Sequence, residues 1–157
     1  MIRRLPDPSF WSGKKVLISG HTGFKGSWLT IWLDKLGAEV SGISLEPDSN
    51  PNLFSAANID SISKGIFLDI RDREALILKV KDIAPQILIH MAAQPLVRRS
   101  YAQPLETFDI NVSGTVNILE SIRQSQSIES AIMITTDKVY TNLENGRHYQ
   151  ENDPLGG

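Results

Sequence analysis

A glycine-rich segment, Gly20 to Gly26 (GHTGFKG), constrains the fold of this chain more than any other feature. It follows the apolar run Val16 to Ile18, so we predict a strand that ends at Gly20 and a helix that begins near Gly23. The first N–H groups of such a helix have no partner within it, and with the helix dipole they attract a pyrophosphate. Gly20 permits a tight turn, Gly23 lets a ligand approach the backbone, and Gly26 lets the helix lie close to the sheet.

The segments that follow the glycines strengthen this interpretation. Residues 24–36 place apolar side chains at helical spacing, and Gly37 follows as a stop signal. A strand over residues 39–45 then completes a βαβ unit of the length that a dinucleotide fingerprint requires. The alternative is a plain strand-to-helix connection without a ligand. The βαβ context favours the dinucleotide-binding turn.

Apolar strands and amphipathic helices continue to alternate along the chain, which is typical of a parallel sheet covered on both faces. Right-handed crossovers then predict an α/β fold, a Rossmann-like doubly wound parallel sheet in the order 3-2-1-4-5. We expect residues 1–14 to be a lead segment and residues 15–157 to form one incomplete cofactor-binding domain. The further elements are strands over residues 65–70, 87–91 and 130–136, helices over 73–83 and 105–124, and a polar tail from 142 to 157.

The longest predicted helix, over residues 105–124, has two apolar faces, whereas a helix covered only by its own sheet needs one. The second face indicates a partner helix from further sequence or another subunit, although deep burial would give the same pattern. One face holds Phe108, Val112, Val116 and Leu119, and the other holds Ile110, Ile118 and Ile122.

Charge and composition exclude several classes of function. The formal net charge is −2 with both signs scattered, so neither nucleic acid nor a membrane surface is an expected partner. The chain has no cysteine, which excludes disulfides and thiolate chemistry, and its three histidines show no metal-ligand spacing, so we expect no metal. The first 15 residues lack an apolar core of signal-peptide length, so we expect a cytoplasmic protein.

The order of the strands places the ligand site at their carboxyl ends, where the winding reverses. At the end of the second strand, Glu46 stands at the distance of a ribose-binding acid but precedes a proline, so Ser44 is the alternative. No arginine stands there, which favours NAD over NADP. At the end of the third strand, Asp69 could accept a hydrogen bond from adenine or serve as a helix cap or turn residue.

The segment after the fourth strand offers small residues and two cations. Ala92 and Ala93 let a cofactor lie against the backbone, or simply allow tight packing. His90 lies within the strand and is predicted to be a satisfied core histidine. Arg98 and Arg99 could face substrate phosphates or water.

The segment after the fifth strand carries the most suggestive chemistry. Thr136, Asp137 and Lys138 place a hydroxyl, a carboxyl and an amine together, which are the parts of a proton-transfer step. The alternative is a turn with an Asp–Lys pair on the surface, and the residues alone favour that alternative.

Five segments stand in order along the chain: GHTGFKGSWL, LDIRD, HMAAQPLVRRSY, NVSGTVNILE and TTDKVY. In this order and at these spacings they resemble the CDP-glucose 4,6-dehydratases, a group of the extended short-chain dehydrogenase/reductase family that acts on nucleotide sugars. The resemblance runs from about Phe10 to the last residue. Related dTDP-glucose dehydratases carry an acidic residue at the position of Lys138, so this lysine indicates the CDP-glucose branch.

This resemblance implies a lyase that converts CDP-glucose to CDP-4-keto-6-deoxyglucose with NAD as a recycled cofactor. Hydride leaves C4 of the hexose, the C5 proton is removed, the C6 hydroxyl departs as water and hydride returns to C6. By position, Thr136 would bind the C4 oxygen, Asp137 would protonate the departing hydroxyl and Lys138 would transfer a proton at C5. The complete enzyme would be a homodimer.

The resemblance also assigns the cofactor contacts residue by residue. The pyrophosphate would meet Gly20, Gly23, Phe24, Lys25 and Gly26, and the adenine would meet Asp69 and Ile70. The inner face of the cofactor would meet Ala92, Ala93 and Gln94, Thr135 would also contact the cofactor, and Asn111 would supply supporting hydrogen bonds.

One departure from the family pattern is large. The family's oxidising base is a YxxxK pair, expected soon after Leu155, and neither Tyr101 nor Tyr149 has a lysine four residues on. We therefore expect the N-terminal cofactor-binding portion of such an enzyme, without its substrate domain, that binds NAD weakly and is inactive alone. Two alternatives stay open: another nucleotide-sugar dehydratase or epimerase of the family, and a non-catalytic nucleotide-binding or interaction module.

Overall fold

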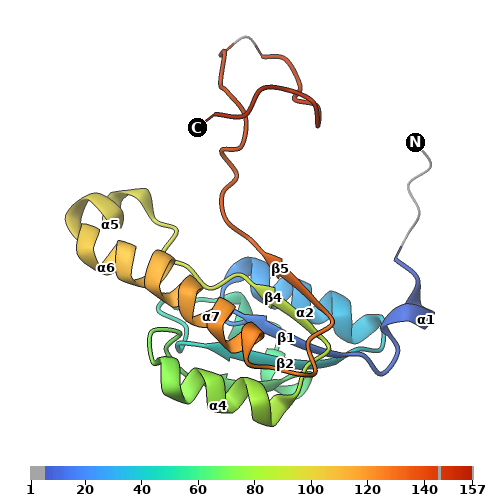
Figure 1. Cartoon of the computed structure of the whole chain (residues 1–157). Helices are drawn as coiled ribbons and strands as arrows, with labels where there is room; N and C mark the ends of the chain where they lie inside the picture. Colours follow the sequence, from blue (N-terminus) through green and yellow to red (C-terminus); the bar gives the residue numbers. More distant parts are fainter. Residues whose placement is uncertain (1–5, 145, 157) are drawn as a thin grey trace.

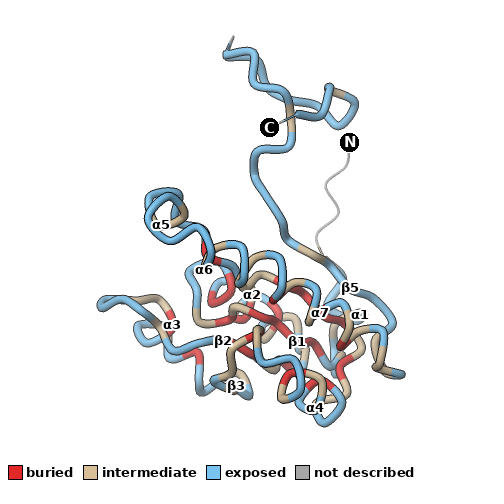
Figure 2. The backbone as a smooth tube through the Cα atoms, turned by 60° about the vertical axis from the view of Figure 1, so that its left-hand side comes forward, coloured by how far each residue is buried: buried red, intermediate tan, exposed pale blue. Residues whose placement is uncertain are grey.

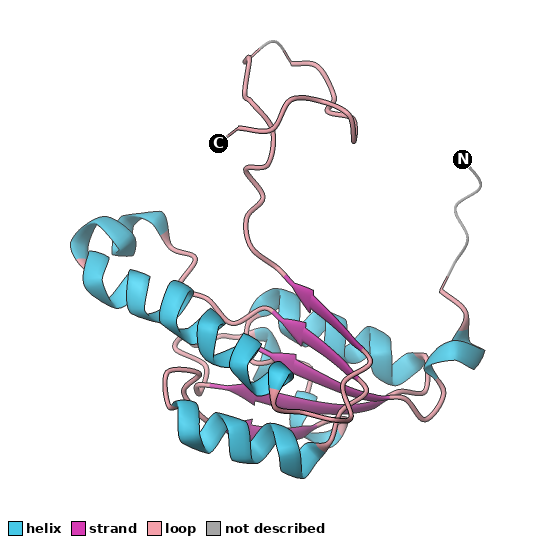
Figure 3. Ribbon diagram, in the orientation of Figure 1, coloured by secondary structure: helices cyan, strands magenta, loops and turns pink. Residues whose placement is uncertain are grey.

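The computed structural model describes residues 6–144 and 146–156, so part of the predicted lead segment and the last glycine lie outside the described residues. Five parallel strands form one sheet in the order β3-β2-β1-β4-β5, which confirms the predicted topology (Figures 1 and 3). The strands are β1 (Lys15–Ser19), β2 (Glu39–Ser44), β3 (Lys64–Phe67), β4 (Ile87–His90) and β5 (Ser130–Met133).

Helices cover both faces of this sheet. The helix α2 (Phe24–Lys35) lies on one face, and α4 (Arg73–Ile83) and α7 (Gly114–Arg123) lie side by side on the other (Figure 1). Asp72 caps α4, because its side chain accepts a hydrogen bond from the N–H of Ala75. Shorter helices, which the sequence patterns did not predict, are α1 (Pro8–Trp11), α3 (Leu53–Ala56), η1 (Ile59–Ser61) and α5 (Val97–Ala102).

The hydrophobic core consists of two clusters, one on each side of the sheet. Figure 2 shows that buried residues concentrate in the central strands. Successive residues of β1 contribute to opposite sides: Leu17 packs toward α4 and α7, while Val16 and Ile18 pack toward Leu33 of α2. The side chains of Val16, Leu17 and Ile18 are all buried, as expected for a central strand of a parallel sheet.

The helix α2 packs on the sheet through small residues rather than through its tryptophans. Its buried positions are Gly26, Ser27, Thr30 and Leu33, whereas Trp28 and Trp32 are each 54% exposed. The small side chains let the helix backbone approach the sheet closely. The apolar side chains from which the helix was predicted therefore include two, Trp28 and Trp32, that do not face the core.

The third and fifth strands each end three residues before their predicted ends. The strand β3 ends at Phe67, and a turn follows in which the N–H of Asp72 donates to the carbonyl of Asp69 at 3.0 Å. After β5, Ile134 N still donates to His90 O at 2.9 Å before the chain leaves the sheet.

The long predicted helix is divided into α6 (Pro104–Phe108), a π-helical turn η2 (Asp109–Ser113) and α7. Ile118 is 1% exposed, and Ile110 and Ile122 pack against the same core cluster. The other predicted face is exposed over its whole length, so the two-face prediction is confirmed. That exposed face consists of the predicted Phe108, Val112, Val116 and Leu119, and the exposed Leu105 of α6 extends it.

The chain after residue 135 extends away from the sheet and folds back on itself (Figures 1 and 2). Tyr140 pairs with Leu155 in an antiparallel bridge, and its ring stacks on Tyr149 at 5.2 Å between centroids. An ion pair of 2.9 Å joins Arg147 and Asp153. Within residues 6–144 and 146–156, none of the helices combines the length and apolar character needed to cross a membrane.

Candidate functional site

The turn after β1 is tightly wound around Gly20. This residue has φ +84°, a conformation that side chains rarely adopt, and its N–H donates to Ile43 O at 2.8 Å. A Cβ at Gly20 would lie 2.7 Å from the backbone nitrogen of Ala92. The turn therefore lies against the carboxyl ends of both β2 and β4.

The start of α2 leaves backbone donors available at this turn. Ser27 N makes the first helical hydrogen bond, to Gly23 O at 2.8 Å, so the N–H groups of Phe24, Lys25 and Gly26 precede the helical ladder. Gly26 packs so closely on the Gly20 carbonyl that a Cβ would collide with it. These donors and the helix dipole form a site suited to a pyrophosphate.

The carboxyl end of β2 is joined to the same turn. The Ser44 hydroxyl is buried, lies 2.9 Å from His21 Nδ1 and accepts a hydrogen bond from Thr22 N at 3.3 Å. Thr22 Oγ1 donates to Leu45 O at 2.9 Å, and Glu46 is exposed. The Ser44 hydroxyl thus supports the turn, and sequence reasoning did not identify His21 or Thr22 as its partners.

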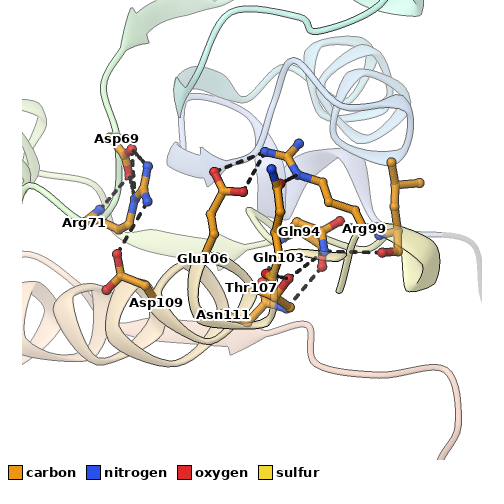
Figure 4. A network of polar contacts seen from close by, with 10 residues as sticks. Asp69, Arg71, Gln94, Arg99, Gln103, Glu106, Thr107, Asp109 and Asn111 are labelled. Carbon is orange, nitrogen blue, oxygen red and sulfur yellow. Dashed lines mark hydrogen bonds and ion pairs between the residues drawn. The ribbon is translucent and has the colours of Figure 1, made fainter. Parts of the chain in front are cut away.

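The two residues predicted to contact adenine, Asp69 and Ile70, lie in the turn after β3, and Figure 4 shows Asp69 with its partner Arg71. Arg71 donates to both carboxylate oxygens of Asp69, at 3.0 and 3.1 Å through Nε, and these hydrogen bonds lower the pKa of Asp69. Arg71 N also donates to Asp69 Oδ1, which confirms the turn role of this aspartate. Ile70 is buried, and a Cβ at Gly114 would lie 2.5 Å from its Cδ1. The Ile70 side chain therefore packs under α7, and a contact of either residue with adenine stays a prediction.

The loop after β4 is held by a reciprocal pair of hydrogen bonds with the π-helical turn (Figure 4). Asn111 Oδ1 accepts from Gln94 N at 2.8 Å, and Asn111 Nδ2 donates to Gln94 O at 3.1 Å. The buried Gln94 side chain donates to Thr107 Oγ1 at 3.0 Å and accepts from Leu96 N at 2.7 Å. Asn111 therefore supports the loop by pairing with the backbone of Gln94, and a contact of Gln94 with the cofactor stays a prediction.

A second buried network lies beneath this loop and is centred on His90. Its Nδ1 lies 2.6 Å from Ser19 Oγ, and its Nε2 lies 3.0 Å from Thr115 Oγ1, which donates to Asn111 O at 2.7 Å. Both ring nitrogens have partners, so the prediction of a satisfied core histidine is confirmed, and burial lowers its pKa. Ser19 and Thr115 were not identified from the sequence, because their partners come from distant elements.

The loop residues Ala92 and Ala93 lie at the same edge, and Ala93 is exposed. Of the two arginines that follow, Arg99 forms an ion pair with Glu106 at 3.1 Å and a hydrogen bond with Gln103 Oε1 (Figure 4). Arg98 is exposed. The charge of Arg99 is thus neutralised within the α5–α6 region.

The segment after β5 leaves its polar side chains exposed to solvent. Lys138 Nζ lies 3.3 Å from Asp137 Oδ1, and the two side chains are 75% and 82% exposed. Thr136 Oγ1 accepts from Lys138 N at 3.1 Å. The hydrogen bond from Lys138 lowers the pKa of Asp137, and the positive charge of Lys25 acts in the same direction. In this structure the residues form the exposed Asp–Lys turn that the residues alone favoured.

Comparisons with known proteins agree with this architecture. The family model described as GDP-mannose 4,6 dehydratase matches residues 17–157. The chain is 47% identical to a CDP-glucose 4,6-dehydratase of Salmonella typhimurium over 96% of its own length and 42% of that protein. A probable dTDP-glucose 4,6-dehydratase of Sinorhizobium fredii is 31% identical, over 89% of this chain and 43% of that protein.

The fold is also similar to that of a solved structure. The UDP-glucose 4-epimerase of Thermus thermophilus, in complex with NAD, has a TM-score of 0.76 and 27% identity over 90% of this chain and 44% of that chain. The present chain thus spans less than half the length of these relatives. Its sequence and its fold place it in the GDP-mannose 4,6-dehydratase family.

Proposed function

We propose that this chain binds NAD at the carboxyl edge of its sheet and forms the cofactor-binding part of a CDP-glucose 4,6-dehydratase. The glycine turn carries this proposal, because Gly20 and Gly26 pack closely enough to place the first amides of α2 at an open edge. The 47% identity to a CDP-glucose 4,6-dehydratase supports the choice of reaction.

The residues of this edge fit NAD from one end of the cofactor to the other. The N–H groups of Phe24, Lys25 and Gly26 would bind the pyrophosphate, and the Lys25 side chain would add a positive charge. The turn at Asp69 and Ile70 would hold the adenine. The inner face would lie along the backbone of Ala92, Ala93, Gln94 and Thr135, while Asn111 fixes that backbone.

Bound NAD supplies hydride transfer to and from the sugar. Thr136 would hydrogen-bond the C4 oxygen, Lys138 would move a proton at C5, and Asp137 would donate a proton to the C6 oxygen as water leaves. An acid at Asp137 must be protonated, whereas the carboxylate here is exposed and its pKa is lowered. Covering the segment with a substrate and a substrate domain would raise that pKa through desolvation.

The isolated chain is expected to bind NAD but not to turn over substrate, because none of its tyrosines has a lysine four residues later. Calorimetric titration should give NAD binding with a dissociation constant of roughly 1 mM or lower, and weaker binding of NADP. An absence of NAD binding at this concentration would remove the cofactor proposal. Formation of a 4-keto sugar from CDP-glucose by this chain alone would contradict the expected inactivity.

The catalytic assignments require the complete enzyme. There, Asp137→Asn should lower kcat by a factor of about 10² to 10⁴ with a smaller effect on KM, because a general acid is lost. The exposed Asp82, on the outer side of α4, offers the matched control Asp82→Asn, which should leave kcat unchanged. An equal rate for wild type and Asp137→Asn would exclude the acid role.

We also propose that the complete enzyme is a homodimer. The exposed apolar face of α6, η2 and α7 supports this, because a continuous apolar face of that length is rarely left in solvent. Sedimentation of the complete enzyme should give a dimer, and Val116→Asp should shift it toward the monomer. A monomeric wild type would rule the homodimer out.

A non-catalytic nucleotide-binding or interaction module stays the second candidate. The strand β5 favours it, because β5 is the last strand of the sheet and its outer edge could pair with another chain. Turnover of CDP-glucose by the complete enzyme would exclude this candidate.

A further inference from the structure

His21, the second residue of the glycine turn, is fully buried at 0% exposure, whereas its neighbours Gly20 and Thr22 are partly exposed. Its imidazole fills space above two strand glycines: a Cβ at Gly42 would collide with the ring, and one at Gly65 would lie 3.0 Å from Nε2. Phe54 packs edge-to-face against the imidazole, with 5.5 Å between ring centroids. We call the space between Gly42, Gly65 and Phe54 the slot. The ring therefore anchors the turn on β2 and β3.

The same residue links the turn to its neighbouring elements. Nδ1 lies 2.9 Å from Ser44 Oγ, which also accepts the N–H of Thr22 at 3.3 Å. The His21 carbonyl accepts a hydrogen bond from Ser27 Oγ at 3.0 Å, at the first turn of α2. A displacement of the imidazole would therefore move both the turn and the start of the helix whose amides face the pyrophosphate site.

The slot suits an uncharged imidazole. An imidazolium has two N–H donors, but Nε2 has no hydrogen-bond partner among the described residues. Burial lowers the pKa of His21, while the charge of Asp60 on η1 and the Ile43 carbonyl oppose this shift. The other residues that face the ring are Gly42 and Ser44 on β2, Gly65 on β3 and Phe54 on α3, which carry no titratable group.

We propose that His21 is a positioning residue for the cofactor turn, and that NAD binds tightly only while the imidazole is neutral and held by Ser44 above Gly42 and Gly65. This inference rests on the proposed function, because it assumes that the turn binds the pyrophosphate of NAD. Protonation would leave an N–H on Nε2 buried without an acceptor among the described residues, so the ring would have to leave its place and the turn would shift. NAD affinity should therefore fall as the pH falls, before the chain unfolds.

The dissociation constant for NAD is to be measured by calorimetry between pH 8 and pH 5, with a thermal melt at each pH. We expect it to rise at least about fivefold in the wild type over this range, the lower end of ordinary coupling between sites. His21→Asn retains a polar atom near Ser44 but does not titrate, so its NAD affinity should be nearly independent of pH. The matched control His148→Asn removes an exposed imidazole and should keep the wild-type profile.

A second measurement does not depend on a variant that folds. If NAD prefers the neutral form, bound NAD must lower the pKa of His21 by reciprocal linkage, and NMR of the labelled imidazoles should detect this shift. His90 is a second buried histidine whose protonation could also lower NAD affinity in acid. If the loss of affinity in acid persists in His21→Asn, His21 is not its cause and the proposal is overturned. An unchanged His21 titration with NAD would also overturn it.

The outcomes separate this inference from the proposed function. If the wild type at pH 8 does not bind millimolar NAD, the proposed function fails and the inference fails with it. If NAD binds at pH 8 with an affinity that does not change with pH, only the positioning role of His21 is overturned. A pH-dependent affinity in the wild type and a flat profile in His21→Asn support both.

Discussion

Gly26, in the first turn of α2, lies directly against the carbonyl oxygen of Gly20, so closely that a Cβ at position 26 would overlap it. The start of the helix and the end of the β1 turn are thus in backbone contact. This contact fixes the direction of the first N–H groups of α2, so a substitution at Gly26 tests whether they bind the pyrophosphate as proposed.

Gly26→Ala should disrupt this contact and lower both stability and NAD affinity. The added methyl group meets backbone atoms that cannot move independently, and overpacking of this kind costs about 1 to 3 kcal/mol. Urea denaturation should show the loss of free energy of unfolding, and calorimetry should show NAD binding weakened by at least about tenfold.

Gly23→Ala is the matched control for this prediction. A Cβ at Gly23 would lie 3.4 Å from Gly20 O, which is an ordinary contact, and the residue does not have a positive φ. Its stability should change by less than about 1 kcal/mol, while NAD affinity should fall because the methyl group would occupy the space through which the proposed pyrophosphate approaches the backbone. Equal stability of the two variants would contradict the close packing of Gly26.

The two faces of α7 should differ strongly in their contribution to stability. Ile118 is 1% exposed, so Ile118→Ala should lower the free energy of unfolding by about 2 to 5 kcal/mol. Leu119 is 49% exposed, and Leu119→Ala should cost less than about 1 kcal/mol in the monomer. Urea titration at low protein concentration measures both, and similar losses would show that α7 is oriented differently.

The ion pair of Asp69 and Arg71 should contribute a pH-dependent part of the stability. The pKa of Asp69 is lowered in the folded chain, so the contribution is present above about pH 4 and is lost as the pH falls through the folded value. Asp69→Asn should cost about 1 kcal/mol at pH 7, and the difference from wild type should vanish in acid.

Denaturant titrations of both proteins at pH 7 and pH 3 check this prediction for Asp69. Asp82 is exposed, and its Oδ2 lies 3.9 Å from Lys79 Nζ. Asp82→Asn should lower the free energy of unfolding by less than about 0.5 kcal/mol at either pH. A difference between wild type and Asp69→Asn that grows in acid would reverse the sign and refute the argument.

The His90 network should depend on the hydroxyl of Thr115. Thr115→Val preserves shape but leaves His90 Nε2 and the Asn111 carbonyl without this partner, which should cost about 1 to 3 kcal/mol. Thr115→Ser keeps the hydroxyl and should retain most of the stability. Thermal melts measure both, and equal melting temperatures would indicate that the hydroxyl makes no net contribution.

Much of the fold could be predicted from periodicity. The alternation of apolar runs and amphipathic segments predicted the strand order, and α4 begins and ends at the predicted residues because Asp72 and the apolar spacing mark it. The short helices α1, α3 and α5 and the turn η1 were missed because fewer than two turns of helix leave no periodic signal. The division of the long helix at η2 was missed because a π-turn depends on tertiary contacts such as the bonds between Asn111 and Gln94.

The sequence by itself determined the α/β topology and the position of the glycine turn that we propose binds phosphate, because both follow from local spacing of glycines and apolar residues. Only the tertiary structure decided which polar side chains support the site. His21 meets Ser44, and His90 meets Ser19 and Thr115, across elements that lie far apart in the chain. Such pairs arise when strands and helices pack, so the burial that makes them important could not be predicted from local spacing.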